Sequence, residues 1–105
     1  MSHEETARAA HRGGSNCASS VYRTFEPINP NPGSAPAPRS EGGKCGAALA
    51  GMKLCREMGI DADFEQAFIR AFGAVKCGEL RRRGVACNDL VGGAARLLDE
   101  LLSKG

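Results

Sequence analysis

The stretch CNDLVGGAARLLDELL, residues 87–102, carries the most regular hydrophobic pattern in the chain. Apolar side chains recur in it at intervals of three and four residues, the repeat that places them along one face of an α-helix. They are Leu90, Val91, Ala94, Leu97, Leu98, Leu101 and Leu102. The pattern predicts a helix that begins near Cys87 or Asn88 and packs one apolar face against a core.

Shorter helical patterns precede this segment. A first helix is expected over residues 17–25 and a second over residues 44–58, ending at Gly59. A third is expected over residues 64–83, but its apolar residues do not share one face. It either has two buried faces, changes course at Gly73 or Gly78, or packs against a second subunit. The N-caps expected for the first and third helices are Ser15 or Asn16, and Asp61 or Asp63.

All five prolines lie between residues 27 and 43, in PINPNPGSAPAPRSEGG. Proline lacks the amide hydrogen and fixes its own φ, so residues 26–43 are expected to form a loop between the first two core helices. Residues 1–12 are polar and are expected to be a flexible segment. Residues 13–105 are expected to form a single helical cysteine domain. Because no segment alternates as a strand does, the fold class is all-α, a small bundle or orthogonal array of three to four short helices.

Charge and hydropathy exclude several classes of partner. Fourteen basic and twelve acidic residues give a net charge of +2, too balanced for a nucleic-acid binder. The basic cluster at residues 81–83 is interpreted as completing a helix C-terminus. No apolar run is long enough for a membrane helix, and residues 1–14 contain no apolar region typical of a secretion signal. We therefore expect a cytoplasmic protein with no nucleic-acid or membrane partner.

The five cysteines are the residues most suggestive of chemistry: Cys17, Cys45, Cys55, Cys77 and Cys87. No two form a Cys-x-x-Cys pair, which excludes the local motifs of thioredoxin-like proteins, zinc fingers and ferredoxins. Three of them, Cys17, Cys45 and Cys87, fall at expected helix starts, where exposed amides favour the reactive thiolate. Cys77 and Cys87 flank the turn at Gly84, within reach of a disulfide if two helices lie antiparallel.

Cysteine is also a common small hydrophobic residue in protein cores. All five cysteines could therefore be structural. Cys55, in the middle of an expected helix between Leu54 and Arg56, fits this interpretation best.

Four stretches in this order resemble the C_GCAxxG_C_C family, whose members are regarded as redox-active. They are Gly14-Ser15-Asn16-Cys17-Ala18, then residues 42–51 around Cys45, then Phe72-Gly73 with Cys77-Gly78-Glu79-Leu80, and finally Cys87 with Leu90-Val91. The chain departs from the pattern in three places. Lys44 replaces a glycine before its cysteine, Gly51 falls late, and the Pro-rich stretch replaces a glycine-rich approach.

The resemblance implies a site made of Cys17, Cys45, Cys77 and Cys87, association with an oxidoreductase, and a metal or iron–sulfur centre. Cys55 matches no cysteine of the family. Two hypotheses follow. The first is a thiol–disulfide oxidoreductase, in which Cys77 and Cys87 cycle and Cys17 or Cys45 attacks or resolves. The second is a metal centre held by the same four residues, either an iron–sulfur cluster for electron transfer or a structural zinc. The alternative is a non-catalytic helical module that forms a homodimer or binds a partner and has buried structural cysteines.

Overall fold

The structure, a computed structural model, describes residues 2–104 and the side chains of residues 2–103. Residues 1 and 105, the outer ends of the two expected segments, lie outside the described residues. Within residues 2–104 there are six α-helices, one short 3-10 helix and no strand, so the all-α class is confirmed. The helices are α1 (His3–Arg12), α2 (Cys17–Thr24), η1 (Glu26–Ile28), α3 (Gly46–Glu57), α4 (Phe64–Phe72), α5 (Cys77–Arg82) and α6 (Cys87–Lys104).

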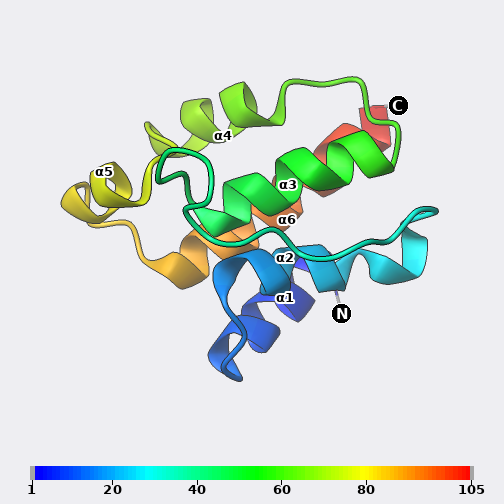
Figure 1. Cartoon of the computed structure of the whole chain (residues 1–105), viewed down its shortest axis with the longest axis horizontal. Coiled ribbons are helices and arrows are strands. Elements are labelled where there is room, and N and C mark those ends of the chain that lie inside the picture. Colours follow the sequence, from blue (N-terminus) through cyan, green and yellow to red (C-terminus); the bar gives the residue numbers. More distant parts are fainter. Residues whose placement is uncertain (1, 105) are drawn as a thin grey trace.

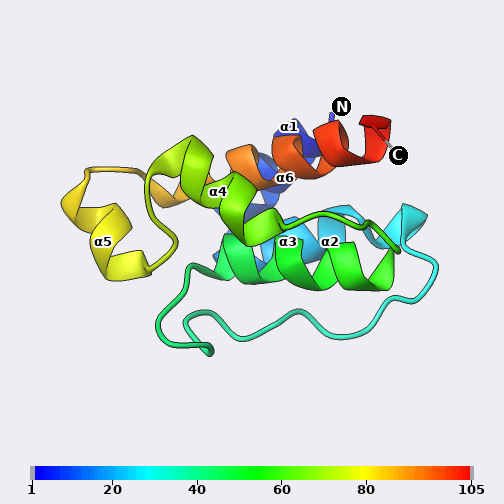
Figure 2. The ribbon, with the colours of Figure 1, turned by 90° about the horizontal axis from the view of Figure 1, so that it is seen from above.

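Helices α2, α3 and α6 form the centre of the molecule, and each packs against the other two. All three run in the same direction, with their first residues at the left of Figure 1, and the view from above agrees (Figure 2). Their contacts bury apolar side chains, among them Val21, Leu54, Val91 and Leu98. Burial of each such side chain stabilises the folded state by about 1.5–3 kcal/mol. The N-termini of three helices therefore lie at one end of the fold.

Side-chain caps start two of the helices where the sequence predicts them. Asn16 Oδ1 accepts a hydrogen bond from the Ser19 amide at 2.8 Å, at the N-cap of α2. Asp63 Oδ1 accepts from the Gln66 amide at 3.1 Å and caps α4. Each cap satisfies an amide that has no partner inside its helix, and so fixes the helix start.

The expected third helix is two helices, because the chain changes course at Gly73. This residue ends α4 in the left-handed conformation, with φ of +86°. Glycine suits the position because it has no Cβ to clash there. Phe68 is therefore buried from α4 and Leu80 from α5, on separate helices. The change of course at Gly73 therefore explains how the apolar residues on both faces of the expected third helix are buried within one chain.

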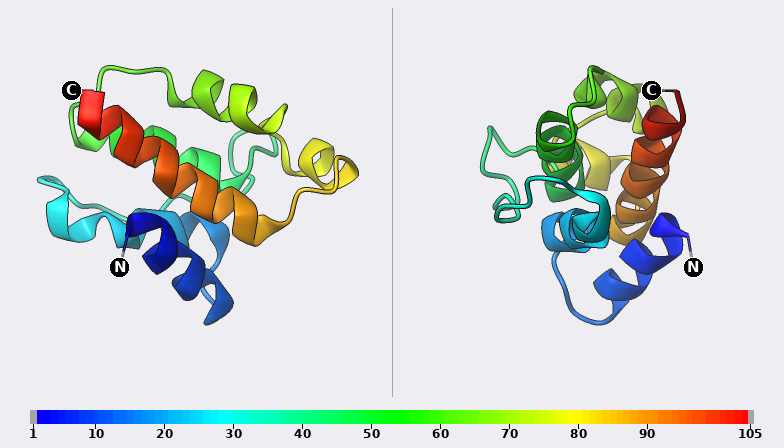
Figure 3. Two further views of the ribbon diagram at one scale, coloured as in Figure 1. Left: turned by 180° about the vertical axis from the view of Figure 1, so that it is seen from behind. Right: turned by 90° about the vertical axis from the view of Figure 1, so that its right-hand side faces the viewer.

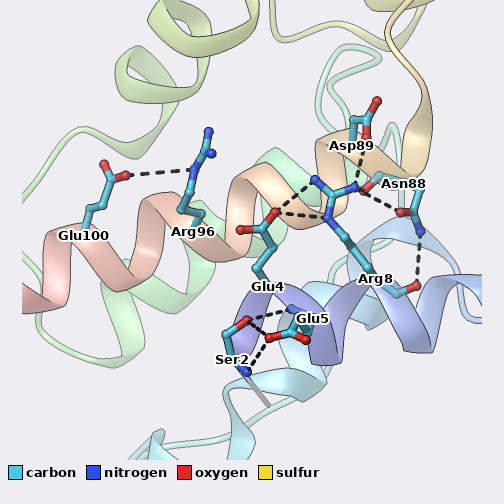
Figure 4. A network of polar contacts seen from close by, with 8 residues as sticks. All are labelled: Ser2, Glu4, Glu5, Arg8, Asn88, Asp89, Arg96 and Glu100. Carbon is cyan, nitrogen blue, oxygen red and sulfur yellow. Dashed lines mark hydrogen bonds and ion pairs between the residues drawn. The ribbon is translucent and has the colours of Figure 1, made fainter.

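Helix α1 packs against α6 through a buried alanine and an arginine. Ala7 is fully buried, and Arg8 lies across the first turn of α6 (Figure 4). Arg8 Nη1 donates to Asn88 Oδ1 at 3.1 Å and to Asp89 Oδ1 at 2.9 Å. Asn88 Nδ2 in turn donates to the Arg8 carbonyl at 3.1 Å. Polar contacts thus fix the start of α6 to α1.

Residues 3–12, within the segment expected to be flexible, form α1 and make further contacts with the rest of the fold. In addition to the Arg8 contacts, the His3 ring lies 4.3 Å from the Phe25 ring, centroid to centroid, and His3 Nδ1 is 2.7 Å from Asp99 Oδ1. Hydrophobic periodicity does not reveal this docking, because the contacts are made mainly by polar side chains and one alanine.

The Pro-rich segment begins as η1 and then continues without regular structure along the outer side of α2 and α3 (Figure 3, right). A partly buried carboxylate holds it there. Glu57 Oε1 accepts from Tyr22 Oη at 2.6 Å and from Asn29 Nδ2 at 2.8 Å, and Tyr22 Oη accepts from the Gly33 amide at 2.5 Å. These bonds fix the loop to the helices that it connects.

Candidate functional site

The four cysteines expected to work together line one cavity of about 30 Å³. The cavity lies where α2, α3, α5 and α6 begin, and its wall is completed by Leu80, Arg81, Val85 and Leu90. Cys55 lies elsewhere, in the last turn of α3, where it lines a separate surface pocket with Met52 and Phe64. The structure thus separates the cysteines into the same groups as the sequence: Cys17, Cys45, Cys77 and Cys87 together, and Cys55 apart.

Each of the four cavity cysteines stands at the start of its helix. Cys17, Cys77 and Cys87 are the first residues of α2, α5 and α6, and Cys45 is the N-cap of α3. The amides at a helix start are partly unsatisfied and carry partial positive charge, which favours an anionic sulfur nearby. The shared direction of α2, α3 and α6 therefore brings several such ends to one place.

An isolated antiparallel bridge between Lys44 and Lys76 sets two of the cysteines side by side. The Cys45 amide donates to the Val75 carbonyl at 2.8 Å, and the Cys77 amide donates to the Gly43 carbonyl at 3.0 Å. Gly43 reaches this geometry with φ of +81°. The bridge joins the end of the Pro-rich loop to the turn after α4 and so determines where α3 and α5 begin.

Gly46 allows the starts of α2 and α3 to approach closely. A Cβ atom at this position would lie 3.1 Å from the Ala18 backbone nitrogen and 3.2 Å from the Ala18 Cβ. Both distances are tighter than ordinary packing contacts. Since Gly46 follows Cys45 and Ala18 follows Cys17, the missing side chain helps to bring these two cysteines to the same cavity.

The cavity thiols differ in exposure and acidity. Cys45 is 1% exposed, and burial raises its pKa to about 12, although the backbone amides of Ala48 and Ala47 act in the opposite direction. Cys17 is half-buried, and its pKa is raised mainly by burial and then by repulsion from the neighbouring Cys87. Cys77 is half-buried and Cys87 is exposed, and all five cysteines are free thiols. Cys87 is therefore the cavity thiol most open to a reagent or partner.

Comparisons of the chain with protein-family models, with curated proteins and with solved structures found no match. The resemblance to the C_GCAxxG_C_C family stays a prediction. In the part of the chain that the structure describes, no helix is long and apolar enough to cross a membrane.

A metal centre fits this site by the type of donor but not by the spacing of the sulfurs. Thiolates are preferred ligands of zinc and of iron–sulfur clusters. Among the described residues, no group of three or more His, Cys, Asp or Glu side chains is arranged to hold a metal ion. A cavity of about 30 Å³ has room for about one water-sized group. A metal would require the sulfur atoms to move.

Arg81 belongs to the site, although sequence reasoning interpreted the basic cluster 81–83 only as a helix end. Arg81 and Arg82 do lie in the last turn of α5, as that interpretation requires. Arg81 also lines the cysteine cavity, and no ion pair involves it within residues 2–103. The sequence did contain a signal for this placement. Arg81 follows Cys77 by four residues, about one turn of the expected helix, and residues at that spacing share a helix face.

Proposed function

We propose that the protein is a dithiol–disulfide exchange protein whose redox pair is Cys17 and Cys87. The observation that carries the proposal is the single cavity lined by four cysteines from four different helices, with Cys17 and Cys87 close enough to influence each other's ionisation. The pairing of Cys77 with Cys87 that the sequence suggested stays a prediction, with Cys77 lining the same cavity.

The order of exposure supports a role for each sulfur. The exposed Cys87 thiolate attacks a substrate disulfide, forms a mixed disulfide and releases the first substrate thiolate. The Cys17 thiolate then attacks the Cys87 sulfur, closes the Cys17–Cys87 disulfide and releases the second. The substrate gains two electrons, the protein loses two, and the two cysteine protons pass to the released thiols or to solvent. Cys45 stays protonated at neutral pH because its pKa is about 12.

The test is mild oxidation of the reduced protein under anaerobic conditions, followed by thiol counting and non-reducing peptide mapping. We expect two of the five thiols to disappear and a peptide linking Cys17 to Cys87 to form. Brief alkylation of the reduced protein at pH 8 should modify Cys87 first and Cys45 last. The variants Cys17→Ser and Cys87→Ser should each prevent the bridge.

Cys55→Ser is the matched control, because Cys55 is a buried cysteine outside the cavity. This variant should oxidise as the wild-type protein does. A protein that keeps five free thiols after oxidation, or that bridges through Cys55, would refute the proposal.

A second candidate is a metal centre held by the same cavity cysteines, favoured by the four sulfur donors around one space. Metal analysis and a visible absorption spectrum of the anaerobic sample separate the two candidates. Stoichiometric zinc, or iron with sulfide and a charge-transfer band, would establish the metal centre. Metal-free protein in which two thiols disappear would establish disulfide exchange.

A further inference from the structure

We propose that the exposed side of the cysteine cavity, where Cys87 and Arg81 reach solvent, selects disulfides that carry carboxylate groups, and that Arg81 is the residue that recognises them. This inference rests on the proposed function and adds the chemical class of the substrate. It begins from the one charged side chain in the cavity wall. Arg81 lines the cavity together with Cys87, and the side chains of both residues are exposed.

The surroundings of Arg81 are basic. Arg82 and Arg83 follow it, Lys76 is the N-cap of the same helix, and all of these side chains are exposed. The one acidic residue of α5, Glu79, is also exposed and forms no ion pair within residues 2–103. The helix that carries Arg81 therefore has an excess of exposed positive charge.

The acidic residue in the first turn of α6, Asp89, is already paired. Asp89 Oδ1 accepts from Arg8 Nη1 at 2.9 Å, and Arg8 also pairs with Glu4. The α1–α6 contact thus gives the acidic residue of this first turn a cationic partner. Arg81 has no such carboxylate partner within the described side chains, so its guanidinium is available to a ligand.

A guanidinium presents a planar set of donors that matches a carboxylate. Beside an exposed thiol, it would hold a carboxylate-bearing disulfide against the attacking sulfur. In the first step, a bond forms between Cys87 Sγ and one substrate sulfur, the substrate disulfide breaks, and a carboxylate-bearing thiolate leaves. The Cys87 proton is released to solvent. The substrate disulfide is the oxidant, and Cys17 completes the exchange as described above.

The experiment compares the rate of the first step with disulfides of different charge. The probes are 5,5′-dithiobis(2-nitrobenzoate), which carries carboxylates, neutral 4,4′-dithiodipyridine, and cationic cystamine. Mixed-disulfide formation on Cys87 is followed by mass spectrometry in the Cys17→Ser background, so the result does not depend on the second step. A cystine peptide flanked by glutamates is a fourth arm and represents a protein substrate.

Arg81→Gln should slow the reaction with the carboxylate probe by about fivefold, the effect of a unit charge at contact distance in water. The neutral probe should be unaffected, and the cationic probe should react faster. Arg81→Lys should recover most of the rate. High salt should reduce the difference, because it screens exposed charges. Arg82→Gln is the matched control, since Arg82 neighbours Arg81 but does not line the cavity.

A loss of rate with the small carboxylate probe would identify small molecules as substrates, and a loss confined to the acidic peptide would identify an acidic protein segment. Equal rates for Arg81→Gln and wild type, or an equal slowing with all probes, would overturn the inference. Failure to form the Cys17–Cys87 bridge in the wild-type protein would instead refute the proposed function, because charge selectivity is measured without that bridge.

Discussion

Burial of Cys45 links the stability of the protein to alkaline pH. Its pKa is about 12 in the folded protein, against 9.0 ordinarily. At a pH between these two pKa values, Cys45 has lost its thiol proton in the unfolded chain and keeps it in the folded protein. Unfolding therefore releases a proton, and stability falls as pH rises above about 9, by up to about 1.4 kcal/mol per pH unit from this group.

Urea unfolding of the reduced protein between pH 8 and 10.5 measures this slope. The Cys45→Ala variant should lose stability less steeply with pH, even if it is less stable at pH 8. Identical slopes for Cys45→Ala and wild type would show that Cys45 titrates normally in the folded state.

At the scale of elements, contact between α3 and α4 depends on Gly51. A Cβ atom there would lie 2.1 Å from Phe64 Cε1, and Phe64 is 2% exposed, so its ring has little room to move. We expect Gly51→Ala to reduce the free energy of unfolding by about 1–3 kcal/mol, the usual cost of overpacking. Chemical denaturation measures the change.

Gly78→Ala is the control for this substitution. Gly78 is an exposed helical glycine, and a Cβ at that position meets nothing within 4 Å. Alanine favours a helix over glycine, so Gly78→Ala should leave stability unchanged or slightly raised. An equal loss of stability in both variants would mean that the approach of Phe64 to Gly51 does not cause the effect.

The docking of α1 on α6 depends on Arg8. Arg8→Ala removes the hydrogen bonds to Asn88 and Asp89 and should cost about 1 kcal/mol, as expected for a partly exposed network. Because residues 2–12 would detach more often, limited proteolysis should cleave them faster. Arg12→Ala is the control, since Arg12 is exposed on the same helix and makes no side-chain hydrogen bond or ion pair among the described residues. Equal cleavage of both variants would argue against the role of Arg8.

At the scale of the whole molecule, a Cys17–Cys87 disulfide would close a loop of about 70 residues, and chain entropy would then stabilise the folded state by up to about 4 kcal/mol. The oxidised protein should unfold at a higher urea concentration than the reduced protein. Cys17→Ser should show no gain on oxidation. A bridge that lowers stability would mean that the fold must distort to form it.

Local patterns along the sequence were sufficient to predict most of the helices and the position of three cysteines at helix starts. The apolar repeat of residues 87–102 predicts α6, and the caps at Asn16 and Asp63 lie where short-range hydrogen bonding places them. Cys17, Cys45 and Cys87 were expected at helix starts and are found there. These features depend on neighbours within a few residues, so the order of residues alone determines them.

Tertiary structure decided which residues share the cavity and how exposed each one is. The direction of α2, α3 and α6, the bridge between Lys44 and Lys76, and the turn at Gly73 bring distant cysteines together. The same packing places Arg81 in the cavity wall and docks α1 through Arg8. Contacts between residues far apart in the chain depend on how all helices pack at once, and no local pattern along the sequence contains that information.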